Sequence, residues 1–311
     1  SNLAKCILSE IWSICCDDFL IKHGALADSG AVLLGMGSLG SQTMNASSDV
    51  DLILIYDAHH DSRSDGGKSL EAPVYYSRLT QKFLTAISAK MPDGSLYKVD
   101  MRLRPSGKNG PVASSLTAFM KYQESEAWMW ERLAFTRARV VCGNDDLKSL
   151  LNSFRSKLLK RNLNKHKVFS DIVSLRERVS KNYTEAQDFP WDIKKGVGGV
   201  FDLQLLGQGC ALIFNIESYD TKAHLSVLSK LDNWSSYEAK KLIRLYFLMF
   251  RLNQIFALIG DYKDLDLFKT KLGRDFVLRE TGSNSINELK LELGSLRKLA
   301  HEMITVKLKQ L

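Results

Sequence analysis

Three aspartates have the spacing of a cation-binding site. Asp49 and Asp51 are separated by one residue at the start of an apolar run, Leu52 to Tyr56, which predicts a strand. Alternate side chains of a strand share a face, with backbone positions roughly 6–7 Å apart, so both carboxylates are expected to point the same way. Carboxylates are ligands for Mg²⁺, and two ions side by side suit phosphoryl or nucleotidyl transfer. Taken alone, an Asp-x-Asp pair is more often a solvated pair of charges.

A glycine turn precedes this pair. Ala31 to Leu34 form an apolar run that predicts a buried strand, and Gly35, Gly37 and Gly40 follow it around Ser38. Glycines in such a turn bring backbone N–H groups close to an anion. Gly-Ser turns are common, and the order of strand, glycine turn, spacer and paired aspartates is what indicates a site.

A third carboxylate lies further along the chain. Residues 96–104 alternate between apolar and charged, which predicts a strand with Asp100, Arg102 and Arg104 on one face. A carboxylate beside two arginines suits a metal ion and the polyphosphate bound to it. On its own this pattern also fits a surface strand with internal salt bridges.

The elements that position these residues change character along the chain. Residues 3–23 and 73–90 have helical periodicity around the predicted strands, with a polar loop at residues 57–72. From about residue 115 the strand signals fade. Helices are expected at residues 116–140, 144–160, 169–183, 235–259 and 286–308, the first with its aromatic side chains mostly in the core. Ser235 and Glu238 form a capping box at the start of the fourth. These patterns predict an α+β fold, with an α/β domain at residues 1–115 and a helical bundle at residues 116–311.

A glycine-rich segment interrupts the helical part. Gly196, Gly198 and Gly199 precede a predicted helix that contains Asp202. The N–H groups at a helix start bind anions. Glycines also permit close packing of helices, and the sequence favours neither interpretation.

The composition is that of an ordinary globular protein, with 45% hydrophobic and 25% charged residues. The net charge of +8 fits a phosphate-rich substrate or an acidic partner, and no nucleic-acid-binding signature accompanies it. Five scattered cysteines without a Cys-x-x-Cys pair predict reduced thiols rather than disulfides or a zinc site. Neither a secretory signal nor an uncharged membrane-length stretch is recognisable, so a cytoplasmic protein without a membrane segment is expected.

Several motifs carry a family resemblance. Gly37-Ser38, ten further residues, Asp49-Val50-Asp51 and a later Asp100 resemble the DNA polymerase β-type nucleotidyltransferase superfamily. Residues 35–40, 45–53 and 99–107 more closely resemble the glutamine synthetase adenylyltransferase family. Residues 122–131, 137–141 and 190–202 look like the C-terminal, adenylylating half of that enzyme.

The resemblance implies a reaction and a set of residues. The fold would be a polymerase β-type nucleotidyltransferase domain followed by a helical bundle. The reaction would transfer AMP from ATP to a tyrosine hydroxyl of glutamine synthetase, with two Mg²⁺ ions and, for the full-length enzyme, a PII-type nitrogen signal protein as partner. The metal ligands and catalytic residues would be Asp49, Asp51 and Asp100. The residues implied to contact the nucleotide are Gly37, Ser38, Gly40, Arg102 and Arg104.

The chain departs from the family pattern at three positions. The family usually has Lys where this chain has Ser38, Gly where it has Ser41, and Glu where it has Gln204. None of these changes touches the three aspartates. The alternatives are the phosphorolytic, AMP-removing half of the same enzyme and a non-catalytic module that binds glutamine synthetase or its signal protein. A nucleotidyltransferase acting on nucleic acid is a more distant one.

Overall fold

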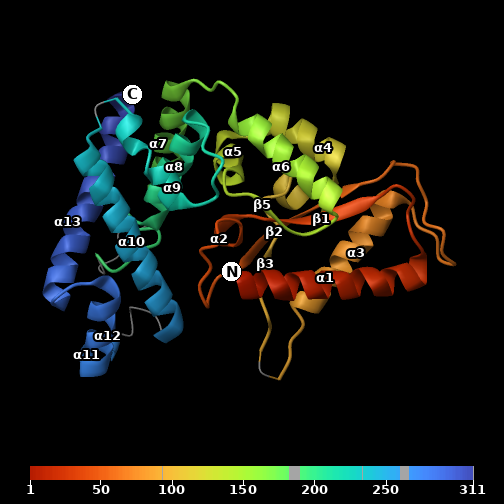
Figure 1. The fold of residues 1–311 in the computed structure, drawn as a ribbon, viewed down its shortest axis with the longest axis horizontal. Coiled ribbons are helices and arrows are strands. Elements are labelled where there is room, and N and C mark those ends of the chain that lie inside the picture. The colour runs from red at the N-terminus through yellow and green to blue at the C-terminus, as the bar shows by residue number, and fades with distance from the viewer. Residues whose placement is uncertain (93, 182–189, 233, 260–265, 311) are drawn as a thin grey trace. The chain divides into compact units, whose positions relative to one another are not determined.

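The computed structural model describes residues 1–92, 94–181, 190–232, 234–259 and 266–310. Its contacts divide the chain into two compact units (Figure 1). Unit 1 consists of Ser1–Met44 and Ser48–Leu158, and unit 2 of Asn45–Ser47 and Leu159–Leu311. The mixed α+β composition expected from the sequence is confirmed. The compact units divide at Leu158, later than residue 115, where the sequence placed the change from mixed to helical structure.

Unit 1 is built on a small mixed sheet in the order β3-β2-β1-β5, with β4 also paired to β2. Strand β1 pairs antiparallel with β2 and β5, whereas β3 and β4 run parallel to β2. The strands are β1 (Gly30–Gly35), β2 (Val50–Asp57), β3 (Val99–Asp100), β4 (Ala113–Ser115) and β5 (Arg139–Gly143).

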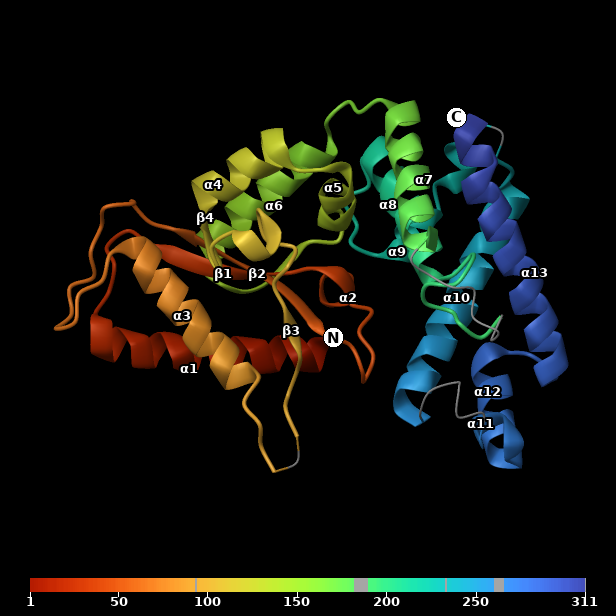
Figure 2. The same ribbon diagram turned by 180° about the vertical axis from the view of Figure 1, so that it is seen from behind.

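Helices cover both faces of this sheet (Figures 1 and 2). Alternation along β2 decides which side chains meet which helices, since Leu52 and Leu54 join one core cluster, and Ile53 and Ile55 join the other. The first cluster packs under α1 (Asn2–His23) and α3 (Ala72–Ile87). The second packs under α4 (Leu116–Lys121), α5 (Met129–Phe135) and α6 (Asp145–Leu159).

The segment predicted as one helix at residues 116–140 is instead broken. Ser115 caps α4, a π-helical turn η2 (Tyr122–Glu126) follows, and the chain is extended at Ala127 and Trp128 before α5 begins. β5 then pairs with β1, which supplies it with hydrogen bonds that no local pattern reveals. Trp128 is 67% exposed rather than in the core.

The strand predicted at residues 96–104 was also too long. Only Val99 and Asp100 pair with β2. The Asp100 carboxylate accepts the backbone N–H of Arg102 at 2.8 Å, and the Arg104 N–H donates to the Met101 carbonyl. These local bonds turn the chain out of the sheet, and the 3₁₀ helix η1 (Gly107–Asn109) follows.

Unit 2 is helical, as expected. The capping box at the start of α10 is confirmed, since the Ser235 N–H donates to Glu238 at 2.9 Å and the Glu238 N–H donates to the Ser235 hydroxyl at 3.1 Å. The helices are α7 (Lys165–Lys181), α8 (Val200–Ile213), α9 (Thr221–Leu225), η3 (Leu228–Lys230), α10 (Ser236–Ile259), α11 (Asp266–Lys269), α12 (Lys271–Thr281), α13 (Ile286–Thr305) and η5 (Lys307–Gln310). Residues 182 and 183, the end of one predicted helix, lie outside the described residues.

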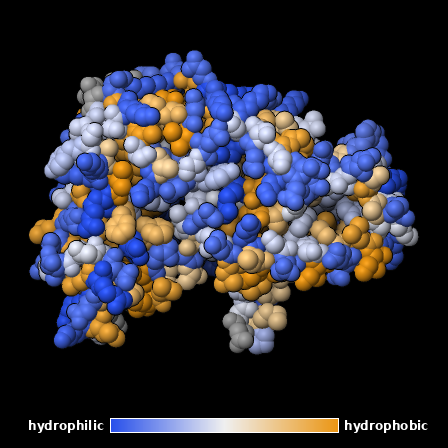
Figure 3. Space-filling model, viewed as in Figure 1, coloured by the Kyte–Doolittle hydropathy of each residue, from blue (hydrophilic) through white to orange (hydrophobic). Residues whose placement is uncertain are grey.

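By length and composition, α10 is the one helix of the described part that is apolar enough to cross a membrane. Four of its leucines, Leu242, Leu245, Leu248 and Leu252, are fully buried, Leu258 near its end is exposed, and it packs against α8, α12 and α13. Hydrophilic residues are interspersed with hydrophobic ones over the visible surface of this unit (Figure 3). A core helix of a bundle accounts for these features.

Candidate functional site

The glycine turn joins β1 to β2 through the single helical turn α2 (Gly37–Gly40). Gly37 has φ +51°, and a Cβ built on it would lie 2.1 Å from Oδ2 of Asp51. A Cβ on Gly40 would lie 2.0 Å from the carbonyl oxygen of Arg137. Glycine is therefore required at both positions, because the backbone of the turn lies directly against a carboxylate on one side and against another segment on the other.

The aspartates Asp49, Asp51 and Asp100, here called the acidic cluster, lie near one another at this end of β2, with Asp51 against the turn. Asp51 and Asp100 occupy paired positions of the parallel strands β2 and β3, and Asp49 is an exposed residue directly before β2. Burial, with the negative charges of Asp100 and Asp49, raises the pKa of Asp51 to about 6, although Arg137 and Arg102 oppose the shift. The structure thus brings all three predicted aspartates into one electrostatically coupled group.

Arg102 engages the cluster directly. Its Nε donates to Oδ2 of Asp100 at 2.7 Å and to Oδ1 at 3.0 Å, and its Nη2 contacts the same carboxylate. These hydrogen bonds hold the pKa of Asp100 below its usual range. The Arg102 side chain is 67% exposed, so it is free to adopt other rotamers. Asp100 therefore has a cationic partner that belongs to the chain itself.

The acidic cluster has the chemistry that a divalent cation requires. Three carboxylates supply oxygen ligands of the kind Mg²⁺ prefers, and a cation beside Asp51 would offset the burial and the negative charges that raise its pKa. As the side chains stand, no three carboxylate, imidazole or thiol groups within the described ranges converge on one metal position. A cation at the cluster would take the place of Arg102 beside Asp100.

Arg104 lies in a different environment from the one predicted. Its guanidinium donates to the carbonyl oxygens of Met101 at 2.9 Å, Gly110 at 3.1 Å and Pro111 at 3.0 Å. These contacts close the turn that follows β3. The structure therefore places Arg104 as a support of that turn and not beside Asp51, and a contact with nucleotide remains a prediction.

The turn residues that depart from the family pattern are accommodated by hydrogen bonds. Ser38 is half-buried in α2, and its carbonyl oxygen accepts the N–H of Thr43 at 2.9 Å. The hydroxyl of Ser41 donates to the Gly37 carbonyl at 2.9 Å. The turn is thus closed by its own backbone and by Ser41.

Two arginines of the segment around β5 also reach the site. Arg139 donates to the carbonyls of Gly40 and Leu39, each at 3.2 Å, and thereby holds the end of the glycine turn. The positive charge of Arg137 opposes the rise in the pKa of Asp51. The signal that points to them is the short β-branched run at Val140 and Val141, which predicts a strand only once β1 is known as its partner.

The glycine-rich segment of unit 2 is a packing feature. A Cβ on Gly198 would lie 2.0 Å from the carbonyl oxygen of Arg297. The first N–H groups of α8 already donate to carbonyls of the preceding turn, and the Gly198 N–H donates to Asp202 at 2.8 Å. Asp202 in turn forms a fully buried ion pair with Arg176 of α7 at 2.6 Å. This helix start has its donors satisfied internally, which decides against an anion site there.

Fold and site together define an α+β protein in which a glycine turn faces a cluster of carboxylates at the edge of a mixed sheet. Residues 1–153 match the family described as glutamate-ammonia ligase adenylyltransferase. The bifunctional glutamine synthetase adenylyltransferase/adenylyl-removing enzyme of Rhodopseudomonas palustris is 38% identical over 234 residues, which are 75% of this chain and 23% of that enzyme. The chain belongs to this glutamine synthetase adenylyltransferase family.

Further relatives carry the same name. That of Mesorhizobium japonicum is 41% identical over 209 residues, 67% of this chain and 21% of the relative. That of Brucella suis is 35% identical over 298 residues, 94% of this chain and 30% of the relative. The alignments therefore extend into unit 2, and the chain spans about a quarter of the length of these curated relatives.

Proposed function

We propose that this chain transfers AMP from ATP to a tyrosine hydroxyl of glutamine synthetase. The observation that carries the proposal is the contact between Gly37 and the carboxylate of Asp51, which stands in register with Asp100. This contact brings backbone N–H groups and cation ligands to one place, as a nucleoside triphosphate requires. The names of the relatives supply the protein substrate.

The acidic cluster would hold two Mg²⁺ ions. Bound there, such ions neutralise the triphosphate and the departing pyrophosphate and increase the acidity of the incoming hydroxyl. The first N–H groups of α2, which have no acceptor within the helix, would contact phosphate oxygens. Arg102, once displaced from Asp100, would add a positive charge beside the phosphates.

The hydrogen bonds from Arg102 refine the role of Asp100. Its carboxylate is ionised and already binds a cationic group through both oxygens, at the position that a metal ion would occupy. Asp100 is therefore assigned to cation binding, ahead of the role of general base. The remaining catalysis consists of positioning and electrostatic stabilisation by Gly37, Ser38 and Gly40 of the turn.

The reaction is tested with ATP labelled on either the α- or the γ-phosphate. Purified glutamine synthetase, Mg²⁺ and the chain are incubated, and label in the glutamine synthetase subunit is measured. AMP transfer predicts α-label in the protein and none from the γ-phosphate. Absence of α-label, or label in added RNA instead, would refute the proposal.

The second candidate is phosphorolytic removal of AMP from glutamine synthetase, since the relatives are named for both activities and the chain spans only part of them. Adenylylated glutamine synthetase and inorganic phosphate would then yield ADP. Formation of ADP without AMP transfer in the first assay would identify the AMP-removing half. A cytoplasmic location and a PII-type partner complete the proposal for the full-length enzyme.

A further inference from the structure

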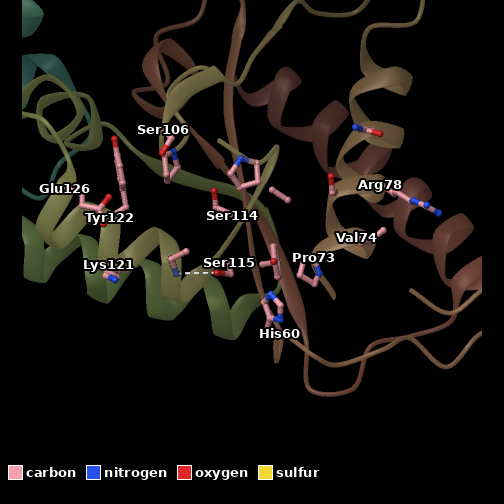
Figure 4. A pocket seen from close by; sticks show the side chains of 17 residues that line it. His60, Pro73, Val74, Arg78, Ser106, Ser114, Ser115, Lys121, Tyr122 and Glu126 are labelled. Atoms are coloured by element: carbon pink, nitrogen blue, oxygen red, sulfur yellow. Dashed lines mark hydrogen bonds between the residues drawn. The ribbon is translucent and has the colours of Figure 1, made fainter. Parts of the chain in front are cut away.

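A second hollow lies in unit 1, away from the acidic cluster. This groove has a volume of about 820 Å³ and lies between α3 and the segment of α4 and η2, beside β4 (Figure 4). β4 pairs with β2 at Leu54–Tyr56, whereas Asp51 stands nearer the other end of β2, roughly 10–16 Å away along the strand. None of the three aspartates lines the groove.

The groove carries excess positive charge. Arg78 of α3 and Lys121 of α4 lie on opposite sides of its lining, with the Arg78 side chain extending outward from α3 (Figure 4). Both are exposed and have no ion-pair partner within the described residues. His60, also in the lining, is next to Asp61 at 3.1 Å. Glu126 is the one carboxylate among the lining residues. Exposed cations without ion-pair partners at the rim of a groove favour an anionic ligand.

A buried hydroxyl in the lining also has no partner. Ser114 of β4 is 3% exposed, and within the described part of the chain its Oγ has no hydrogen-bond partner. Buried hydroxyl groups in folded proteins are almost always hydrogen-bonded, so one without a partner at the wall of a cavity indicates a ligand or a water that completes it.

The remaining wall is non-polar. Pro73 and Val74 of α3, with Pro105 and Pro111 of the segment after β3, contribute apolar surface, and the half-buried Tyr122 lines the side opposite Pro73 and Val74 (Figure 4). A cavity of this size is in the range of roughly 300–1,000 Å³ typical of sites for small organic molecules. It is too large and too apolar to be explained by a single inorganic ion.

We propose that this groove binds a small organic anion, with its charged group held by Arg78 or Lys121, a polar group on the Ser114 hydroxyl, and a flat non-polar body against the prolines and Tyr122. It is a binding site additional to the acidic cluster and does not depend on the function proposed above.

The test uses three probes: AMP, which has both a charged group and a flat ring system, adenosine, which lacks the charge, and inorganic phosphate, which lacks the ring system. Binding to the full chain is measured by calorimetry in EDTA, where the acidic cluster holds no cation and repels the two anionic probes, AMP and phosphate. AMP is expected to bind at least about tenfold more tightly than either adenosine or phosphate, and more weakly as salt is added. Because neither divalent cation nor glutamine synthetase is present, failure here is distinct from failure of AMP transfer.

Variants locate the binding. The double variant Arg78→Ala, Lys121→Ala is expected to weaken AMP binding at least about tenfold. Lys82→Ala, which removes a partly exposed lysine of α3 that pairs with Asp18 outside the groove, should leave it unchanged. Ser114→Ala should weaken binding several-fold while the melting temperature stays equal or rises, because a buried hydroxyl without a partner is removed.

Three results would overturn the proposal. One is the absence of AMP binding. Another is equal binding of AMP and phosphate, which would show an adventitious ion only. The third is AMP binding that is unaffected by both the double variant and Ser114→Ala.

Discussion

Replacing Asp51 by Asn should stabilise the protein at neutral pH while it removes a proposed cation ligand. The pKa of Asp51 is raised from 3.8 to about 6, chiefly by burial and then by the charge of Asp100. Its folded form holds a proton that the unfolded form has released, so stability falls as the pH rises from about 4 to above 6. The Asn side chain of the variant has no titratable group, so the stability of the variant does not fall with pH for this reason.

The size of the effect follows from that shift. A difference of about two pKa units corresponds to about 3 kcal/mol. Since Asp51 is only partly buried, solvent screening reduces the expected gain to about 1–3 kcal/mol. At about 2–4 °C per kcal/mol for a unit of this length, the melting temperature of unit 1 should rise by roughly 3–10 °C at about pH 7.5.

The assay compares melting curves of wild type and Asp51→Asn from about pH 4 to about pH 7.5, without divalent cations. The difference in melting temperature should grow with pH through this window. Adding Mg²⁺ should stabilise the wild type and leave the variant almost unchanged. Asp57→Asn, an exposed aspartate at the far end of the same strand, serves as the control. A variant that is no more stable than wild type at neutral pH, or equally more stable at every pH, would refute the electrostatic account.

Three further substitutions test other parts of the structure. Gly37→Ala combines a left-handed backbone with a steric clash and should cost about 1–3 kcal/mol of unfolding free energy and weaken Mg²⁺ binding, whereas Gly67→Ala, with open space around it, should be neutral; equal melting temperatures would contradict this. Arg102→Ala removes the competing cation from the acidic cluster and should tighten Mg²⁺ binding about two- to fivefold by calorimetry; weaker binding would show that Arg102 supports the site instead. Arg176→Ala leaves a buried carboxylate unpaired in unit 2 and should cost about 3–5 kcal/mol in denaturant unfolding, against almost nothing for the exposed Arg178→Ala; a small loss would mean that the core carboxylate is solvated or neutral.

The sequence was sufficient where local pattern and tertiary structure agree. The apolar runs of β1 and β2 each fill both faces of the sheet, so they were recognisable without knowledge of their neighbours. The Asp-x-Asp spacing at Asp49 and Asp51 and the capping box of α10 depend only on residues close in the chain.

The sequence was insufficient where a partner distant in the chain decides the structure. The helix predicted from the sequence extended to residue 140. Residues 139–143 instead form a strand, because β1 offers them a free edge. For that reason Arg137 and Arg139 were not recognised as neighbours of the glycine turn. Arg104 shares the polarity of Arg102, yet a turn that no periodicity predicts directs it to backbone carbonyls.

The open alternatives in unit 2 required atomic contacts. Gly196–Gly199 has the composition of either an anion-binding turn or a packing site. Two contacts distinguish them. The Arg297 backbone fills the space beside Gly198, and the Asp202 carboxylate accepts the Gly198 N–H.

That the acidic cluster carries out AMP transfer is tested by comparing wild type with Asp49→Asn. Each protein is incubated with purified glutamine synthetase, Mg²⁺ and ATP labelled on the α-phosphate. Asp49 is exposed, so the variant should fold and melt like the wild type within about 0.5 kcal/mol. Labelled glutamine synthetase is expected with the wild type, and a loss of at least about 10²-fold in rate with the variant. Equal rates of labelling by the two proteins would contradict this prediction.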